Sequence, residues 1–258
     1  TDALARVKQN MKGITGEEIE DVTAKAMLMA KTFDTDVNEV TRGVNNVMQN
    51  FGVTAEKAFD MFAAGGARGM NMSNEMFDNA AEYSVLFKTM GYSAEEYFGI
   101  LERGSSQGIY SLDYLNDVTV EFQKRIKNGS KTTSDAMALL PKETQKVWEQ
   151  FNKGDATVKD VISSVVGSLK TMDNQNEASQ IAVSLFGTKF EELEADAVYA
   201  MLGTTEAMKG FEGATEQAAQ GVEGTFKNRV VSAFREATMG IAELGNTTQG
   251  KELLDWIA

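Results

Sequence analysis

Apolar residues recur at intervals of three and four along most of this chain, which is the spacing of one face of an α-helix. Residues 19–33 place apolar side chains at offsets of 0, 3, 7, 10, 11 and 14, and residues 37–51 repeat the same offsets. Residues 158–172 carry the broadest stripe of this kind and are expected to be central to a core. Because no stretch alternates with the period of two that is typical of strands, the pattern predicts an all-α protein without a sheet.

Helix-start signals divide the first half of the chain at nearly even steps of 20, 19, 19, 20 and 18 residues. A side-chain hydroxyl at such a place accepts a hydrogen bond from a free backbone N–H. Each step has room for a helix of about 14 residues and a short turn, so we expect a compact multi-helical bundle of about ten to twelve short antiparallel helices. The six hydroxyl residues are Thr15, Thr35, Thr54, Ser73, Ser93 and Ser111.

Single residues refine these expected helix ends. Thr15 with Glu18, Ser93 with Glu96, and Thr188 with Glu191 have the spacing of a reciprocal capping box. Pro141 suits the first position of a helix, where its missing N–H costs nothing. Glycines near the expected turns supply the positive φ that helix ends often need, namely Gly52, Gly91 and the pair Gly65 and Gly66.

Changes in composition divide the chain into four parts. Residues 1–127 form a six-helix array with a pitch of about 19 residues, and a polar run at 128–133 separates it from a second helical subdomain at 128–202, whose last helix spans 190–202. Residues 203–224 are acidic and rich in glycine, so we expect a loose, solvated connector. Residues 225–258 are predicted to hold an amphipathic helix and the start of a truncated helix, as in a piece of a longer protein.

Composition excludes several kinds of chemistry. The 258 residues include no cysteine and no histidine, so Ser-His-Asp and Cys-His catalysis and zinc sites of thiolates and imidazoles are excluded. A formal charge of −13 opposes binding to a phosphate backbone, so we expect no direct nucleic-acid binding. No run reaches the roughly 18 apolar residues of a membrane span, and we expect no membrane segment.

Three patterns could carry chemistry, and each has a simpler interpretation. Asp34–Asn38 begins like a calcium loop but lacks the glycine and final glutamate, so helix capping is favoured. Gly65–Gly69 lacks the strand and the lysine of a phosphate-binding loop, so a turn is favoured. Helical glycan-cleaving enzymes can use one buried glutamate, but none of the candidates is distinguished from a surface charge. These candidates are Glu82, Glu96, Glu102 and Glu121. We therefore predict no catalytic, cofactor-binding or metal-binding residue, no cofactor and no small-molecule substrate.

The segment NAAEYSVLFKTMGYSAEEYFGILERGSSQG at 79–108 resembles the core region of tail tape measure proteins of long-tailed bacteriophages and prophages. Three further segments resemble that family in the same order, namely VEFQKR at 120–125, NGSKTT at 128–133 and LFGTKFEEL at 185–193. The resemblance extends over about residues 40–244 and identifies the chain as a core-region fragment.

The resemblance implies a structural and non-enzymatic role. Proteins similar to this one set the length of the phage tail, occupy the tail-tube lumen in several copies during assembly, and leave ahead of the DNA at infection. It implies synthesis in the bacterial cytoplasm, a place inside the virion tail, self-association, and contacts with tail-tube and tail-assembly proteins. One alternative is a helical peptidoglycan-cleaving domain carried by a tail protein, because some members of the family carry such segments. Another is a plain helical adaptor outside any phage.

Overall fold

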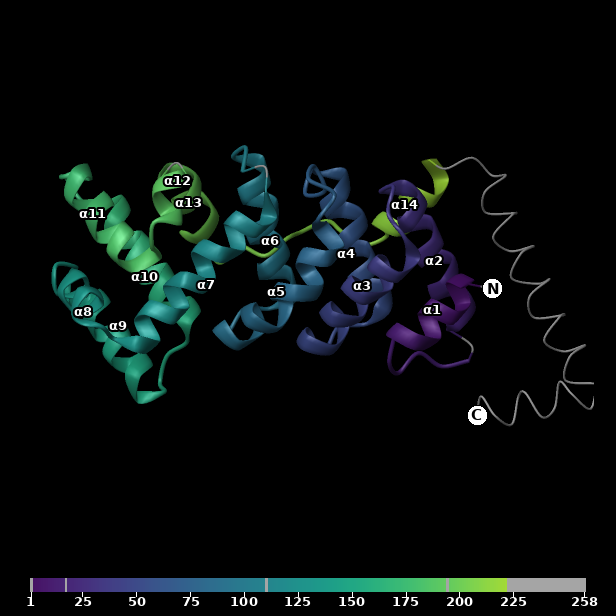
Figure 1. The fold of residues 1–258 in the computed structure, drawn as a ribbon, viewed down its shortest axis with the longest axis horizontal. Helices are drawn as coiled ribbons and strands as arrows, with labels where there is room; N and C mark the ends of the chain where they lie inside the picture. Colours follow the sequence, from purple (N-terminus) through teal and green to yellow (C-terminus); the bar gives the residue numbers. More distant parts are fainter. Residues whose placement is uncertain (1, 17, 110, 194, 222–258) are drawn as a thin grey trace, which may run out of the picture.

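The computed structural model describes residues 2–16, 18–109, 111–193 and 195–221. Its first seven helices form two layers, in which odd-numbered helices pack on odd-numbered ones and even-numbered helices on even-numbered ones (Figure 1). The helices are α1 Asp2–Asn10, α2 Ile19–Thr32, α3 Val37–Phe51, α4 Ala55–Ala67, α5 Met76–Met90, α6 Ala94–Ser106 and α7 Leu112–Asn128. The described residues contain helices and no strand, which confirms the all-α prediction.

The two layers arise from a repeated pair of helices. Within the odd layer α3, α5 and α7 begin at residues 37, 76 and 112, and within the even layer α2, α4 and α6 begin at residues 19, 55 and 94. A unit of 36 to 39 residues therefore repeats, which is two of the predicted steps. A single helix cannot bury its apolar face alone, so successive pairs stack and share a continuous core.

Side-chain hydrogen bonds link neighbouring helices of the odd layer at the same repeat distance. Asn46 Nδ2 donates to the Ala81 carbonyl at 3.1 Å, and Asn50 Nδ2 donates to Ser84 Oγ at 2.8 Å. Between α5 and α7, the Tyr83 hydroxyl donates to Asp117 Oδ1 at 3.1 Å. The partners are 34 or 35 residues apart, and their numbers rise together along both helices. Helices of one layer are therefore parallel, while consecutive helices reverse direction.

The second half of the chain extends the same core. Helix α7 packs on α11, and α6 packs on α13. The predicted central stripe is confirmed in α10, where Val161, Ile162, Val165 and Val166 are fully buried. The helices are α8 Lys131–Ala138, α9 Lys142–Lys153, α10 Val158–Lys170, α11 Gln175–Phe186, α12 Lys189–Glu192 and α13 Ala195–Leu202. One hydrophobic cluster includes residues on both sides of position 127, and separate folding of 1–127 and 128–202 stays a prediction.

Helix starts follow the predicted hydroxyl residues in part. Thr54 and Ser93 accept the N-cap hydrogen bonds of α4 and α6, and Ser93 with Glu96 forms the predicted capping box. Thr35 was the wrong residue for α3, because the carboxylate of the adjacent Asp36 is the stronger acceptor and takes the Glu39 N–H at 2.8 Å.

Two other predicted starts are displaced. Helix α5 begins after Glu75 rather than Ser73, because residues 71–74 form a separate turn in which Asn74 has a φ of 58°. Helix α2 begins at Ile19, and Thr15 lies in the turn before it, where its N–H donates to the Glu18 carboxylate at 3.2 Å.

Glycine and proline follow the predicted pattern at some ends only. Gly52 and Gly91 have the expected positive φ of 71° and 99°. Gly65 and Gly66 instead lie inside α4, where a Cβ on Gly66 would be 2.2 Å from the Phe33 ring. Glycine suits these two positions because neighbouring side chains occupy the space that a Cβ would need. Pro141 is the extended residue before α9 rather than its first residue.

The described residues form fourteen helices, slightly more than expected. The helix expected at 190–202 is divided because Leu193 is extended, with φ −102° and ψ 138°. Thr188 makes no capping hydrogen bond, whereas Thr157 and Asp160 form a capping box that was not among the predicted ones. The polar run at 128–133 contains the start of α8, capped by Ser130.

The segment expected to be a loose connector is packed where the structure describes it. Met208, Phe211 and Thr215 are 3%, 6% and 2% exposed, and residues Ala214–Gly221 form α14. The prediction was wrong because the few large apolar residues of this segment lie among glycines and acidic residues, a composition that is typical of a loose connector. The amphipathic helix expected within 225–258 lies outside the described residues.

Candidate functional site

An extended segment crosses the face of the even layer in the direction opposite to the order of its helices. We call residues 203–213 the strap. It leaves the end of α13, passes α6 and α4, and continues into α14, which packs on α4 and α2 (Figure 1). The strap thus joins the second half of the chain to its first helices.

Arg103 on α6 holds the first part of the strap by its backbone. Its guanidinium donates to the Glu206 carbonyl at 2.6 Å, the Thr204 carbonyl at 3.2 Å, and the Met201 carbonyl at 3.2 Å through two nitrogens. Burial of the Arg103 guanidinium lowers its pKa, although an arginine stays charged in proteins. Carbonyl oxygens therefore replace the water that this cation loses.

Arg68 at the end of α4 holds the middle of the strap in the same way. Its Nη2 atom donates to the carbonyls of Lys209 and Gly210, both at 2.8 Å. Its Nη1 atom forms an ion pair with Glu102 on α6 at 3.1 Å. The ion pair links α4 with α6 and orients the guanidinium toward the strap.

Acceptors on the same face hold the N–H groups of the strap. The Met208 N–H donates to the Glu95 carbonyl at 2.8 Å. The Asp60 carboxylate, in a residue that is 5% exposed, accepts from the Gly213 N–H at 2.8 Å and the Thr215 N–H at 3.0 Å. Both polar edges of the strap backbone are therefore bound by groups from α4 and α6.

The surface beneath the strap is shaped for a backbone. A Cβ on Gly99 would be 2.5 Å from the Glu206 carbonyl oxygen and 3.0 Å from the Met208 nitrogen. Beside it, burial acts to raise the pKa of the Glu95 carboxyl, but hydrogen bonds from Lys57, its own backbone N–H and Ser93 outweigh burial and lower it. The site offers donors for carbonyls, acceptors for N–H groups and apolar contact for two side chains, which is the chemistry of peptide recognition.

A buried polar cluster lies between α5, α6 and α7, and no pattern in the sequence marks it. Asn79 Oδ1 accepts from Asn116 Nδ2 at 2.6 Å and from the Tyr97 hydroxyl at 3.3 Å, and its Nδ2 donates to Asp113 at 2.9 Å. Burial raises the pKa of Tyr97 well above its ordinary value. The cluster fixes the relative positions of three helices.

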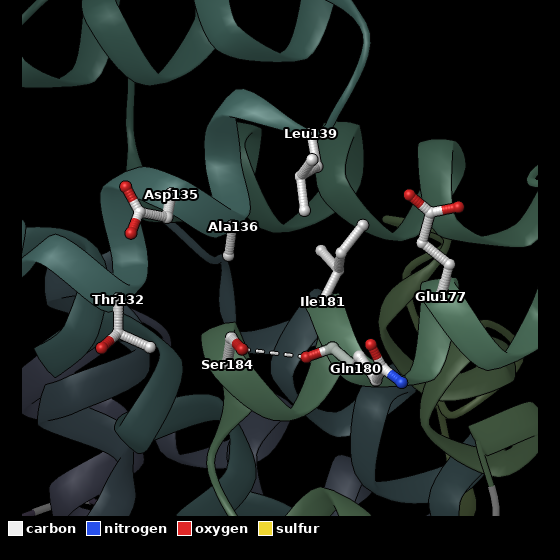
Figure 2. A pocket seen from close by; sticks show the side chains of 8 residues that line it. All are labelled: Thr132, Asp135, Ala136, Leu139, Glu177, Gln180, Ile181 and Ser184. Atoms are coloured by element: carbon white, nitrogen blue, oxygen red, sulfur yellow. Dashed lines mark hydrogen bonds between the residues drawn. The ribbon is translucent and has the colours of Figure 1, made fainter.

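A cleft lies between α8 and α11, with a volume of about 270 Å³ (Figure 2). Leu139 at its rim is 60% exposed, and Ser184 Oγ donates to the Gln180 carbonyl at 2.9 Å. Figure 2 shows the carboxylates of Asp135 and Glu177 on opposite sides of the cleft, not paired as an acid and a base would be. The remaining lining residues are Thr132, Ala136 and Ile181.

The residues considered from the sequence have structural contacts. Within Asp34–Asn38, the Asp36 side chain caps α3, and Asn38 Oδ1 accepts from Asn10 Nδ2 at 2.9 Å. These oxygens therefore accept hydrogen bonds from a backbone N–H and a side-chain amide of the protein itself. At Gly65 in Gly65–Gly69, a Cβ would be 2.6 Å from the sulfur of Met70. The absence of a phosphate or calcium site stays a prediction.

The four glutamates considered for catalysis do not gather into one site. Glu96 belongs to the capping box of α6 and pairs with Lys159 at 3.1 Å, and Glu102 pairs with Arg68. Glu121 pairs with Arg125 at 2.9 Å, and Glu82 is exposed on α5.

Among the described residues, no three side chains of the metal-binding kinds lie close enough to hold a metal ion. No helix in the described part of the chain combines the length and apolar character that crossing a bilayer requires.

Comparison with known proteins gives two matches. The sequence model of the family described as phage-related minor tail protein matches residues 1–187. A protein named as a probable tape measure protein of Streptomyces phage phiC31 is 23% identical over 239 residues. That match covers 91% of this chain and 33% of the relative, so the chain spans about a third of the relative's length. No solved structure shows a significant match.

Proposed function

The chain belongs to the phage-related minor tail protein family, and from this premise we propose that it is a folded module of a tape measure protein, which takes part in setting tail length, in tail assembly and in DNA ejection. The match over residues 1–187 is the observation that carries the proposal. The similarity to a probable tape measure protein over 91% of the chain supports the finer assignment.

The arrangement of helices supports a mechanical role. Stacked helix pairs share one continuous core, and each pair adds length along the row of helices (Figure 1). The strap crosses the even layer and connects helices far apart in the sequence. A module of this kind transmits force through packed helices and does not require a reactive group.

Two states of this chain would contribute very different lengths. A single continuous helix of 258 residues would reach about 390 Å, whereas a folded domain of that size has a radius of gyration of about 18 Å. We propose that the chain keeps its folded form and forms an end module of the ruler, rather than an extended segment along the tube. The turns at Gly52 and Gly91, both with positive φ, support the folded form.

Deletion in frame from a phage that encodes the chain tests this proposal, with tail length measured by electron microscopy. Tails of unchanged length together with lost assembly or infectivity would support the end module. Tails shorter by about 390 Å would show that the chain lies extended in the tube. Normal tails with normal infectivity would overturn the tail role altogether.

We also propose that the module acts without enzymatic activity and that its partners are tail-tube and tail-assembly proteins inside the virion tail. Engagement of Glu96, Glu102 and Glu121 in ion pairs supports this view. Incubation with purified peptidoglycan provides the test, with the wild type compared to Glu→Gln variants at each of these positions and at Glu82. Release of muropeptides that depends on one glutamate would favour the peptidoglycan-cleaving alternative.

A further inference from the structure

The strap is held almost as a bound peptide would be held. Its carbonyls at residues 204, 206, 209 and 210 accept from Arg103 and Arg68, and its N–H groups at residues 208 and 213 donate to acceptors on α6 and α4. These contacts involve the backbone of the strap rather than its side chains. They are available to any extended segment with the right anchors.

Two apolar side chains of the strap provide those anchors. Met208 and Phe211 are three residues apart and are 3% and 6% exposed, whereas Lys209 between them is exposed. Gly99 provides the flat surface where the strap backbone passes between Glu206 and Met208. Together these features fix how an extended segment binds. The flat helix face, the paired donors and acceptors, and the two apolar anchors allow it to lie in one register only.

We propose that the face of α4 and α6 under the strap is a peptide-binding groove, and that residues 203–221 of a second copy of this chain are its intermolecular ligand. The occupant follows from the structure, because this segment already fills the groove within one chain. In an exchanged pair each groove makes the same contacts as before, so no new complementary surface is needed. The exchange concerns the chain alone and does not depend on the proposed tail role.

The position of the strap makes exchange physically accessible. Residues 203–213 contain no helix, so only backbone rotations near Gly203 are needed to redirect the segment while α13 stays on α6. The groove residues Arg103 and Arg68 lie about 100 to 140 positions earlier in the chain. Because α13 stays on α6, the strap is a short tether whose effective concentration at its own groove is on the order of mM, and a second copy competes when copies are crowded together.

A mixing experiment with two full-length variants tests the exchange. The strap variant, Met208→Ser with Phe211→Ser, keeps an intact groove but lacks the anchors. The groove variant, Gly99→Leu, keeps an intact strap but blocks its path with a side chain. Each variant alone is expected to be monomeric by light scattering after size exclusion, and the mixture is expected to contain a one-to-one heterodimer.

The matched control combines both defects, Gly99→Leu with Met208→Ser and Phe211→Ser. It is expected to form no dimer with the strap variant, because it offers neither anchors nor groove. Far-UV circular dichroism checks that every variant keeps the helical signal of the wild type. Folded strap and groove variants that stay monomeric when mixed would overturn the proposal.

A labelled peptide of residues 203–221 gives a second readout, and its binding to the wild-type chain does not depend on the folding of any variant. Fluorescence anisotropy should show saturable binding to the strap variant and binding to the wild type that is weaker by roughly tenfold or more, because the tethered strap competes. A peptide with serine in place of Met208 and Phe211 should not bind. Failure of the wild-type peptide to bind the wild-type chain, even above the effective concentration of the tether, would contradict the groove.

Discussion

The buried carboxylate of Asp60 on α4 accepts a hydrogen bond from the backbone N–H of Thr215, 155 residues later in the chain, at 3.0 Å. Its second oxygen accepts from the Gly213 N–H at 2.8 Å. One side chain thus holds the end of the strap and the first turn of α14. The bond joins the fourth helix of the chain to the last helix that the structure describes.

Asp60→Ala should lower the free energy of unfolding by about 1–3 kcal/mol, because one buried and one partly buried N–H group lose a charged acceptor. Asp60→Asn keeps one carbonyl oxygen and should cost less than Asp60→Ala. Urea unfolding followed by circular dichroism measures both values. Equal losses for the two variants would mean that the hydrogen bonds to the strap are not what Asp60 contributes.

Gly99→Ala should release the strap although it raises helix propensity. The added Cβ would be 2.5 Å from the Glu206 carbonyl oxygen, so the strap must move away. Tryptic cleavage after Lys209 in the strap should then become faster than in the wild type. The matched control is Gly167→Ala on α10, where a Cβ meets nothing within 4 Å.

Gly167→Ala should raise the free energy of unfolding by up to about 1 kcal/mol and leave cleavage after Lys209 unchanged, because alanine is the better helix former. Limited proteolysis followed by mass spectrometry compares the two variants. Equal cleavage rates at Lys209 in Gly99→Ala and Gly167→Ala would show that the close approach at Gly99 does not hold the strap.

Asn79→Ala should be among the most damaging substitutions of a polar residue. It removes the shared partner of Asn116, Tyr97 and Asp113, of which Asn116 and Tyr97 are fully buried. We expect a loss of about 2–4 kcal/mol, since buried polar groups are left without hydrogen bonds. Tyr97→Phe removes only the longest of these bonds, at 3.3 Å, and should cost about 1 kcal/mol or less. Chemical unfolding of both variants gives the comparison. A larger loss of stability for Tyr97→Phe would show that Tyr97, rather than Asn79, is the main contributor to the cluster.

The repeated helices could be predicted because local chemistry determines them. An apolar stripe predicts a helix without information from elsewhere in the chain, and a hydroxyl before it or a glycine after it marks one end, as Ser93 does at the start of α6 and Gly91 at the end of α5. Errors at the helix starts are of one or a few residues, as at Asp36, where a neighbouring carboxylate competes with the predicted hydroxyl.

The strap could not be predicted because its structure depends on distant residues. Arg103 has no sequence pattern that marks it as a ligand for carbonyls about 100 residues later. Met208 and Phe211 are two apolar residues in a segment whose glycines and acidic residues are typical of a connector. Likewise, Asn79 and Asn116 are polar residues on helices and become a buried pair only when the repeat aligns α5 with α7.

Gly91→Ala should destabilise the protein more than Gly129→Ala, although both glycines have a positive φ, 99° and 58°. Alanine at either position pays about 1–2 kcal/mol for the left-handed conformation. At Gly91 a Cβ would also be 2.9 Å from the Thr157 side chain at the start of α10, whereas at Gly129 it meets nothing within 4 Å. Overpacking adds about 1–3 kcal/mol at Gly91 alone. Thermal unfolding measures the difference, and equal losses would show that Thr157 moves aside freely.

Stability should be nearly constant between pH 6 and pH 8 and should fall in acid. The chain has no histidine, so no side chain of that type titrates in the neutral range. Burial acts to raise the pKa of Asp160, but hydrogen bonds from Thr157 and the charge of Lys159 outweigh it, and the pKa is lowered. The pKa of Glu95 is likewise lowered, mainly by Lys57 acting against burial.

A carboxyl whose pKa is lower in the folded state stabilises the protein above its ordinary pKa, and this stabilisation is lost as the pH falls through the folded value. The ordinary values are 3.8 for Asp160 and 4.5 for Glu95, so the urea midpoint should begin to fall below about pH 5 and continue to fall toward pH 2. The double variant Asp160→Asn with Glu95→Gln should start from a lower midpoint at pH 7 and show a shallower decline in acid. Urea titrations at intervals from pH 8 to pH 2 measure both curves. Parallel acid declines in the variant and the wild type would show that other carboxylates control the acid transition.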